Sequence, residues 1–437
     1  MEDKEIIVNL VEDNKTKSKY DKNDWTVFLK GARERRETDN YSYKDYENKF
    51  KEYIRDQIST EENANTLKKS RLYYRDAIAG DYFNENYVSL EDKYIKRILP
   101  ICKLLIITAN PIERAVLHHK VTDSGSCVLI RSICNTTAFY VFKWGKYWVV
   151  HIHQGDTGAE KDLGTSIAIN EALKYFTPNV IISLGVAFGI DYNIQHIGNV
   201  LVSRRLFPYS DNKRDEDKVK PARSQDKTID DWLHVRLQNT IGFMDDVTYG
   251  DILSGGSVMS SCEEKDRICA GYTEEDFIIG GEMEGNAVFQ CTKRMGIPGV
   301  VIKGICDFGI IKNGLSEGGP DAEEVIKESL QAFAMMQAVD KCNPLVNDIV
   351  LFSSPKQSDN KKLLNKYHAC IILFIISQFI IMLFEIGLPF LMHKAVWVVI
   401  EIVFFFALII IHNWFTIQQC IGHEYVKKLI RKNKKQQ

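Results

Sequence analysis

The sequence Gly-Gly-Glu-Met-Glu-Gly at residues 280–285 is the stretch from which the fold is best inferred, and we expect it to open a helix. That helix should run from about Gly285 to Met295 and pass through Gly-Ile-Pro at 296–298 into the apolar strand 300–302. Gly-Ile-Cys-Asp follows at residues 304–307. Two acidic clusters therefore flank one helix–strand unit.

Strands and helices also alternate on the N-terminal side of this unit. β-rich runs with turn residues between them predict strands, and a helix is expected at about 164–176, before Pro178. The other strands are expected at 103–109, 127–133, 138–153 with a hairpin turn at 144–146, 180–183, 199–203 and near 251–254. This alternation predicts an α/β domain over residues 100–342, with layers around a mostly parallel core.

Residues 1–99 differ from this domain in composition, because they lack proline and hold two glycines among many charged residues. Such a composition favours helices. Aromatic and aliphatic residues recur at helical spacing between Tyr43 and Ile58 and define one apolar face. That face either packs on the rest of the protein or belongs to a recruitment module.

The last fifth or so of the chain predicts a membrane anchor. A polar linker at 343–366 precedes two apolar stretches, at about 367–392 and 395–417, each near the twenty residues that cross about 30 Å of hydrocarbon. Lysines precede the first stretch, and a basic tail at 418–437 follows the second. This charge distribution predicts a helical hairpin in the inner or plasma membrane, with both termini and the catalytic domain in the cytosol.

Two acidic residues, Glu385 and Glu401, lie inside these apolar stretches. Ionisable groups in a membrane usually face another helix or water. They either favour self-association of hairpins, and hence a homo-oligomer, or sit at the lipid–water boundary.

Composition limits the other classes of function. Lys plus Arg number 56 and Asp plus Glu 58, so no field of one sign favours nucleic acid as a partner. The ten cysteines include no Cys-x-x-Cys pair, and only His118-His119 and His151-x-His153 suggest a metal site. The N-terminus lacks the features of a secretory signal. We expect reduced cysteines, no metal ion and no cofactor.

On the 280–285 and 304–307 motifs, the chain resembles the nucleoside phosphorylase and 5'-methylthioadenosine/S-adenosylhomocysteine nucleosidase superfamily. Its members carry an acidic-Met-Glu helix start and a Ser-Asp at the end of the next strand. The resemblance extends to a Glu in the turn after the first strand, to Gly-Val-Ala-Phe-Gly at 185–189 and to Ser254-Gly255, and covers about 240 residues. It implies a three-layer fold with a central mixed sheet.

The resemblance also implies roles for individual residues. Glu284 corresponds to the ligand of the ribose hydroxyls, Asp307 to the acid that protonates the purine N7, and Glu113 to the residue that positions the attacking water. The residues expected to line the substrate site are Glu282, Met283 beneath the sugar, Ala187 and Phe188 near the base, and Val258 and Met259, which match backbone contacts to the purine.

The chemistry of N-glycosidic cleavage fits these residue types. The ribose develops positive charge, and the purine leaves as an anion unless it is protonated, so one acid and one base are needed. Burial after an apolar strand would raise the pKa of Asp307, while Glu113 would remain ionised. A carboxylate at Glu284 can accept hydrogen bonds from both ribose hydroxyls.

Each assignment has an ordinary structural alternative. Glu284 and Glu113 are also typical of helix starts, and Asp307 of a turn or cap. Arg204 and Arg205 suit either a substrate 5'-phosphate or a solvated strand end.

The chain departs from the family at two positions. Cys306 replaces the usual Ser before Asp307, and Lys303 replaces an Arg four residues before it, which blurs the hydrogen-bonding support of the acid. No clear set of phosphate-binding arginines surrounds the early glycines, so hydrolysis is favoured over phosphorolysis.

The expected function is a purine nucleoside or nucleotide N-ribosidase that releases adenine. Similar domains fused to membrane modules in antiphage systems imply a membrane-anchored defence or stress effector. The alternatives are a phosphate-dependent phosphorylase, a nucleotide sensor that controls a membrane-disrupting hairpin, and a scaffold that recruits a partner through residues 1–99.

Overall fold

The computed structural model describes part of the chain in detail. The described residues are 34, 42–59, 65, 87–89, 91–123 and 129–353, the last range with gaps at 135–136, 155–163, 210–212, 216–217, 221–226, 242–243, 257–258, 274–275, 310–319 and 349–350. The expected hairpin, Glu385, Glu401 and Val258 all lie outside them. No helix within the described ranges has the length and hydropathy needed to cross a membrane.

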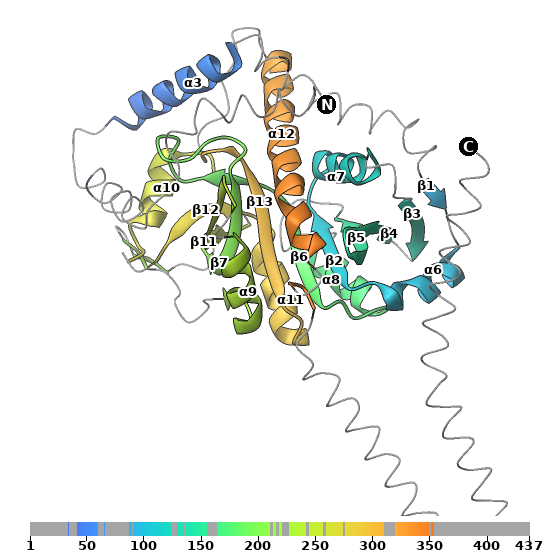
Figure 1. The fold of residues 1–437 in the computed structure, drawn as a ribbon. Helices are drawn as coiled ribbons and strands as arrows, with labels where there is room; N and C mark the ends of the chain where they lie inside the picture. The colour runs from blue at the N-terminus through green and yellow to red at the C-terminus, as the bar shows by residue number, and fades with distance from the viewer. Residues whose placement is uncertain are drawn as a thin grey trace, which may run out of the picture. The chain divides into compact units, whose positions relative to one another are not determined.

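One mixed sheet lies at the centre of the fold, and eleven strands of the described chain join it (Figure 1). They run in the order β1-β3-β4-β5-β2-β6-β12-β11-β7-β10, and β13 pairs with both β6 and β7. A separate hairpin pairs β8 with β9. The strands are β1 (Tyr87–Ser89), β2 (Leu104–Thr108), β3 (Leu129–Cys134), β4 (Thr137–Trp144), β5 (Tyr147–His153), β6 (Val180–Gly189), β7 (Val200–Pro208), β8 (Lys213–Asp215), β9 (Lys218–Lys220), β10 (Lys227–Thr228), β11 (Val247–Ser254), β12 (Ile278–Glu282) and β13 (Gly299–Asp307).

The pairing of β13 closes part of this sheet into a ring. β6 pairs with β12, β12 with β11, β11 with β7, β7 with β13, and β13 with β6. In a closed ring each strand has neighbours on both sides, and side chains fill the interior. β13 is accordingly buried along its whole length except at its last residue, Asp307.

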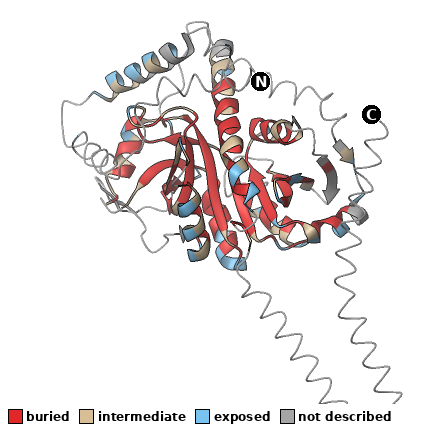
Figure 2. Cartoon of the chain, in the orientation of Figure 1, coloured by how far each residue is buried: buried red, intermediate tan, exposed pale blue. Residues whose placement is uncertain are grey.

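Helices pack on the sheet in two contacting pairs, α7 with α12 and α8 with α11. α12 lies along β13 and β6 (Figure 1). Buried residues concentrate in the strands and on α12 (Figure 2). The helices are α3 (Tyr43–Ser59), α6 (Asp92–Ile98), the 3-10 turn η1 (Leu99–Ile101), α7 (Pro111–Asp123), α8 (Thr165–Leu173), α9 (Asp231–Ile241), α10 (Cys262–Cys269), α11 (Gly285–Met295) and α12 (Pro320–Asn347).

The α/β class and mixed sheet are confirmed, as are the expected helices α8 and α11 and the hairpin turn at Gly145-Lys146 between β4 and β5. Several strands are longer than predicted, and β6 extends to Gly189 because its Gly-Val-Ala-Phe-Gly end stays in the ladder.

The 280–285 stretch opens α11 at Gly285 as predicted, but Gly280 to Glu282 complete strand β12, which was not predicted. Pro111 is the first residue of α7, where its missing N–H costs no hydrogen bond.

The flanks of the 100–342 range also join the fold. β1 pairs in parallel with β3. Ile95 and Ile98 of α6 are fully buried. At the other end, α12 includes Pro344 and runs to Asn347, so the expected linker at 343–366 begins within a helix.

The apolar face expected between Tyr43 and Ile58 lies on α3, and two of its tyrosines contact Tyr192. The rings of Tyr46 and Tyr53 lie 5.2 and 5.4 Å from that of Tyr192. The chain divides into compact units at residues 1–352 and 353–437. α3 belongs to the first unit, and the predicted hairpin to the second.

Candidate active site

Glu113 is held at the junction of β2 and α7. Its backbone N–H donates to the side chain of Asn110 at 2.9 Å, and its carboxylate accepts from the backbone of Asn110 at 3.2 Å, a reciprocal capping arrangement. The carboxylate also accepts from the N–H groups of Ala109 at 2.6 Å and Val186 at 2.8 Å. Glu113 is 1% exposed, so the alternative of a solvated helix start is wrong.

A fully buried ammonium lies beside this carboxylate. Lys303 on β13 places its Nζ 3.0 Å from Oε2 of Glu284, the residue that precedes α11. A Cβ on Gly185 would lie 2.2 Å from Oε1 of Glu113 and 2.8 Å from Nζ of Lys303. Because Gly185 has no side chain, it leaves room for the side chains of Glu113 and Lys303 to lie close together.

The charges in this cluster are mutually dependent. Burial disfavours the charged form of Lys303, but the carboxylates of Glu284, Glu113 and Glu282 outweigh that effect and raise its pKa. Burial raises the pKa of Glu113, and Lys303 opposes the rise. Lys303 pairs with Glu284, a partner that the sequence analysis did not predict.

Glu282 lies at the end of β12 and caps α11. Its carboxylate accepts from the N–H groups of Glu284 at 2.9 Å and Gly285 at 2.8 Å, and it contacts the hydroxyl of Ser254. Burial and the nearby charge of Glu284 raise its pKa to about 7. The helix-capping role proposed as an alternative for Glu284 thus belongs to Glu282, while Glu284 makes no side-chain cap.

Asp307 ends β13 at a register shift opposite Phe188 of β6. Bulges of this kind re-aim side chains. Asp307 is half-buried rather than deeply buried. Its Oδ1 accepts from the N–H of Gly309 at 2.8 Å, and its Oδ2 accepts from the thiol of Cys306 at 3.2 Å. Cys306 therefore supplies the contact that the family's serine was expected to make.

Two of the predicted base-contacting residues lie next to Asp307. A Cβ on Gly309 would lie 2.9 Å from Cγ of Met259 and 3.4 Å from the ring of Phe188. The same ring would lie 2.1 Å from a Cβ on Gly281. Phe188, Met259 and Asp307 thus converge on one loop.

The remaining predicted substrate-site residues are less informative. Ala187 is buried and pairs with Ile305, and Met283 is half-buried between Glu282 and Glu284. Val258 lies outside the described residues.

Tyr209, which follows β7, is a site residue that the sequence analysis missed. Its ring lies against Gly255, where a Cβ would come within 2.3 Å of it. Burial raises the pKa of its phenol, and the charges of Glu282, Glu284 and Glu264 add to the effect. The phenol therefore lies within the field of the carboxylate cluster. No motif surrounds Tyr209, so only the fold identifies it.

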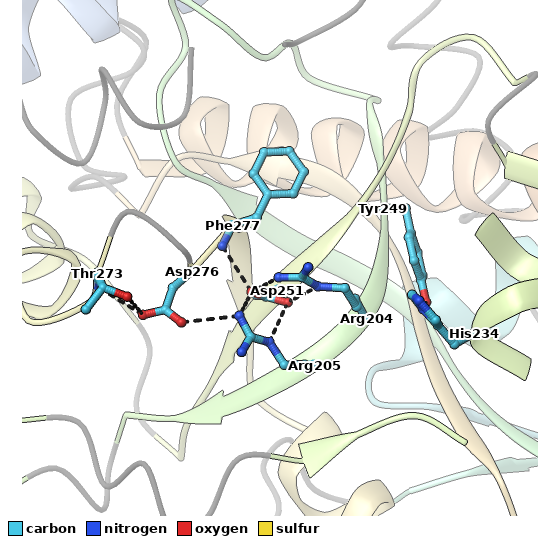
Figure 3. Close-up of polar contacts among 8 residues, drawn as sticks. All are labelled: Arg204, Arg205, His234, Tyr249, Asp251, Thr273, Asp276 and Phe277. Carbon is cyan, nitrogen blue, oxygen red and sulfur yellow. Dashed lines mark hydrogen bonds and ion pairs between the residues drawn. The ribbon is translucent and has the colours of Figure 1, made fainter. Parts of the chain in front are cut away.

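Arg204 and Arg205 both form ion pairs within the protein. Both donate to the buried carboxylate of Asp251, Arg204 through its Nε at 2.8 Å and Arg205 through its Nε at 3.2 Å (Figure 3). Arg205 also pairs with Asp276 at 3.2 Å. A register shift between β7 and β11 lets two consecutive residues reach one carboxylate.

The histidines that suggested a metal site form a hydrogen-bonded cluster. His118 Nε2 lies 2.8 Å from His151 Nδ1, and His151 Nε2 lies 2.9 Å from the hydroxyl of Thr108. Burial lowers the pKa of both rings, which favours their neutral forms. In the described part of the chain, no group of three or more His, Cys, Asp or Glu could hold a metal ion.

The sequence of this chain matches a known protein family. The family model described as "Phosphorylase superfamily" matches residues 103–339. A "Death domain-containing ATP nucleosidase" from Amphimedon queenslandica is 23% identical over 244 residues, which cover 50% of this chain and 45% of that protein. The chain thus matches about half the length of this relative.

Solved structures with similarity include nucleosidases and a related hydrolase. S-adenosylhomocysteine nucleosidase from Streptococcus pyogenes is 15% identical, with a TM-score of 0.44 over 57% of this chain and 97% of that one. Futalosine hydrolase of Helicobacter pylori is 16% identical, with a TM-score of 0.40 over 55% and 98%.

The raised pKa of Glu282 predicts a pH-dependent stability. Its carboxyl binds its proton more tightly in the folded chain, with a pKa of about 7, than in the unfolded chain, with an ordinary value of 4.5. The stability that it contributes is therefore present below pH 4.5 and lost as the pH rises through about 7. Urea unfolding between pH 4.5 and 8 should give a flatter profile for Glu282→Gln than for the wild type.

The matched control is Glu263→Gln, at an exposed position on α10, which should keep the wild-type slope. Parallel profiles for the wild type and Glu282→Gln would contradict the assignment.

Proposed function

Because this chain belongs to the phosphorylase superfamily, we propose that it hydrolyses the N-ribosidic bond of a purine nucleoside or nucleotide and releases the purine base. The observation that carries the proposal is the cluster in which one buried ammonium, Lys303, pairs with Glu284 and lies close to Glu113, while Asp307 ends β13 beside Phe188. Sugar-binding, water-binding and base-facing groups thus come from neighbouring strands.

Glu284 is suited to bind the ribose. Its Oε2 accepts from Lys303, which leaves further acceptor positions of the carboxylate for the two vicinal hydroxyls. An ionised carboxylate there opposes the positive charge that grows on the ribose in the transition state. The ammonium of Lys303 orients this carboxylate.

Glu113 is suited to bind one water molecule. A carboxylate offers about four acceptor positions, and three are occupied by the N–H groups of Ala109, Asn110 and Val186. The remaining position can orient a water toward C1' of the ribose. Burial also raises the pKa of Glu113, which makes its carboxylate a stronger base for that water.

Asp307 is suited to protonate the leaving base. In the proposed reaction the C1'–N9 bond breaks, N7 gains the proton of Asp307, and the purine leaves neutral. The water oxygen bonds to C1' and loses a proton to Glu113. Asp307 ends ionised, and a proton returned from Glu113 through solvent restores the starting state.

The proposed substrates are adenine nucleosides and nucleotides. The curated relative is named for ATP, which places adenine nucleotides beside adenosine and methylthioadenosine in the panel of candidates. The two paired arginines, Arg204 and Arg205, are bound to Asp251, so they offer no support for a 5'-phosphate site.

The membrane anchor also belongs to the proposal. It rests on the apolar stretches at 367–392 and 395–417 and their basic flanks, with the domain and both termini in the cytosol. Two further proposals depend on this anchor: self-association of the chain through the hairpin, and a role as a defence or stress effector. Carbonate extraction of membranes that hold the full chain addresses the anchor, because a peripheral protein would be released.

The activity is tested by chromatography of free base after incubating the full chain with adenosine, methylthioadenosine, AMP and ATP, with and without phosphate. Base release should need no phosphate. Asp307→Asn should lower the rate by about 10²- to 10⁴-fold, the usual contribution of a general acid. Glu284→Gln should also lower it strongly, while both variants keep the wild-type circular dichroism.

Asp340→Asn, at a half-buried carboxylate that pairs with Lys120, serves as the control and should keep full activity. Formation of ribose 1-phosphate would replace hydrolysis by phosphorolysis. A folded wild-type chain that binds a nucleotide but releases no base would favour the sensor instead.

A further inference from the structure

Lys265, on α10, is a buried cation that the proposed reaction does not use. It is 1% exposed, and its Nζ donates to the backbone carbonyls of Ile190 at 2.6 Å and Phe308 at 2.7 Å. Ile190 is the first residue after β6, and Phe308 the first after β13. One side chain therefore links the ends of two neighbouring parallel strands to a helix.

This arrangement is costly for a purely structural residue. Removing an ammonium from water costs several kcal/mol even after relaxation, and an opposite charge usually offsets the loss. Lys265 has no carboxylate partner among the described residues, and both of its acceptors are neutral. An apolar side chain of similar length would avoid that cost, but it would leave the carbonyls of Ile190 and Phe308 without this donor.

The linked strand ends carry the groups that would act on the purine. Asp307 immediately precedes Phe308, and Phe188 lies two residues before Ile190. Asp307 and Phe188 are register partners across β13 and β6. The hydrogen bond to the carbonyl of Phe308 therefore fixes the backbone next to Asp307. The hydrogen bond to the carbonyl of Ile190 fixes the backbone close to Phe188.

The two residues that follow Asp307 are held by further contacts besides the one from Lys265. Gly309 adopts a positive φ of 63° and donates its N–H to Asp307. Met259, which precedes α10, lies close to the same glycine. Met259, Gly309 and the end of β6 therefore lie close together, and the ammonium of Lys265 links the end of β6 to Phe308.

We infer that Lys265 is a positioning residue for base release: its ammonium holds the Asp307 loop and the Phe188 strand end in register, so that the proton donor faces the base. This inference rests on the proposed hydrolysis. Lys265 touches neither reacting atom in this scheme, and it acts through Asp307. A displacement of about 1 Å in such a group can lower a rate by roughly 10²-fold.

A double-mutant cycle on the full chain tests the inference. The variants are Lys265→Met, Asp307→Asn and the pair, assayed for base release from the substrate that the wild type cleaves fastest. Lys265→Met should lower kcat by about 10- to 100-fold in the wild-type background. In the Asp307→Asn background it should have little further effect, because residues that act as a unit are not additive.

Lys174→Met, at the residue that follows α8 and whose side chain is 62% exposed, is the matched control and should keep the wild-type kcat. Lys265→Arg, which keeps the charge and the donors, should recover part of the rate. If Lys265→Met does not fold, Lys265→Gln replaces it in the cycle, since its amide retains donors without the charge.

The outcomes separate this inference from the proposed function. A wild-type chain that releases no base would overturn the hydrolysis itself. An active wild type with an equally active Lys265→Met, or with losses that multiply in the double variant, would overturn the positioning role and leave the hydrolysis standing.

Discussion

The ammonium of Lys303 is the charge on which the rest of the site depends. Three carboxylates, Glu113, Glu282 and Glu284, are almost completely buried in the same part of the sheet. Like charges that share a buried site disfavour one another, and each loses its hydration. Lys303 supplies the opposing charge, and its raised pKa follows from these three neighbours.

The sheet closure explains how four separate segments reach this one charge. β13 pairs with β6 on one side and β7 on the other, so that Lys303 lies opposite Gly185 within a closed ring. Gly185 leaves room for Glu113 to approach from the β2–α7 junction. The β12–α11 junction brings Glu282 and Glu284 to the same place. Glu282 and Glu284 then have different contacts. The carboxylate of Glu282 accepts from backbone N–H groups and caps α11, whereas the carboxylate of Glu284 makes no cap to the helix.

Local pattern predicted much of this fold from the sequence. The spacing of apolar residues and Gly296 at the helix end identified α11 with its observed bounds. β12 was missed because Gly280 and Gly281 have low strand propensity, and pairing with β6 and β11 overrides it. α12 was missed because residues 332–339 are all buried, so that no polar face marks the helix.

The candidate site residues were named largely from the resemblance, and the structure brings Glu113 and Glu284 together and sets Asp307 beside Phe188 and Met259. The pairing of Lys303 with Glu284 was not predicted, since it depends on strand pairing that no local pattern encodes. Tyr209 and Lys265 were not singled out for the same reason, because their contacts join segments distant in sequence.

The most direct test of this account is the difference in unfolding free energy between the wild type and Lys303→Met, measured by chemical denaturation at pH 7 and again at pH 4.5. Removing one partner of a buried ion pair usually costs about 3 to 5 kcal/mol, because the remaining charge is left uncompensated. We expect a loss of that size at pH 7 and a smaller one at pH 4.5, where protonated carboxyls no longer need the ammonium. A variant as stable as the wild type at pH 7, or a loss that does not change with pH, would contradict the account.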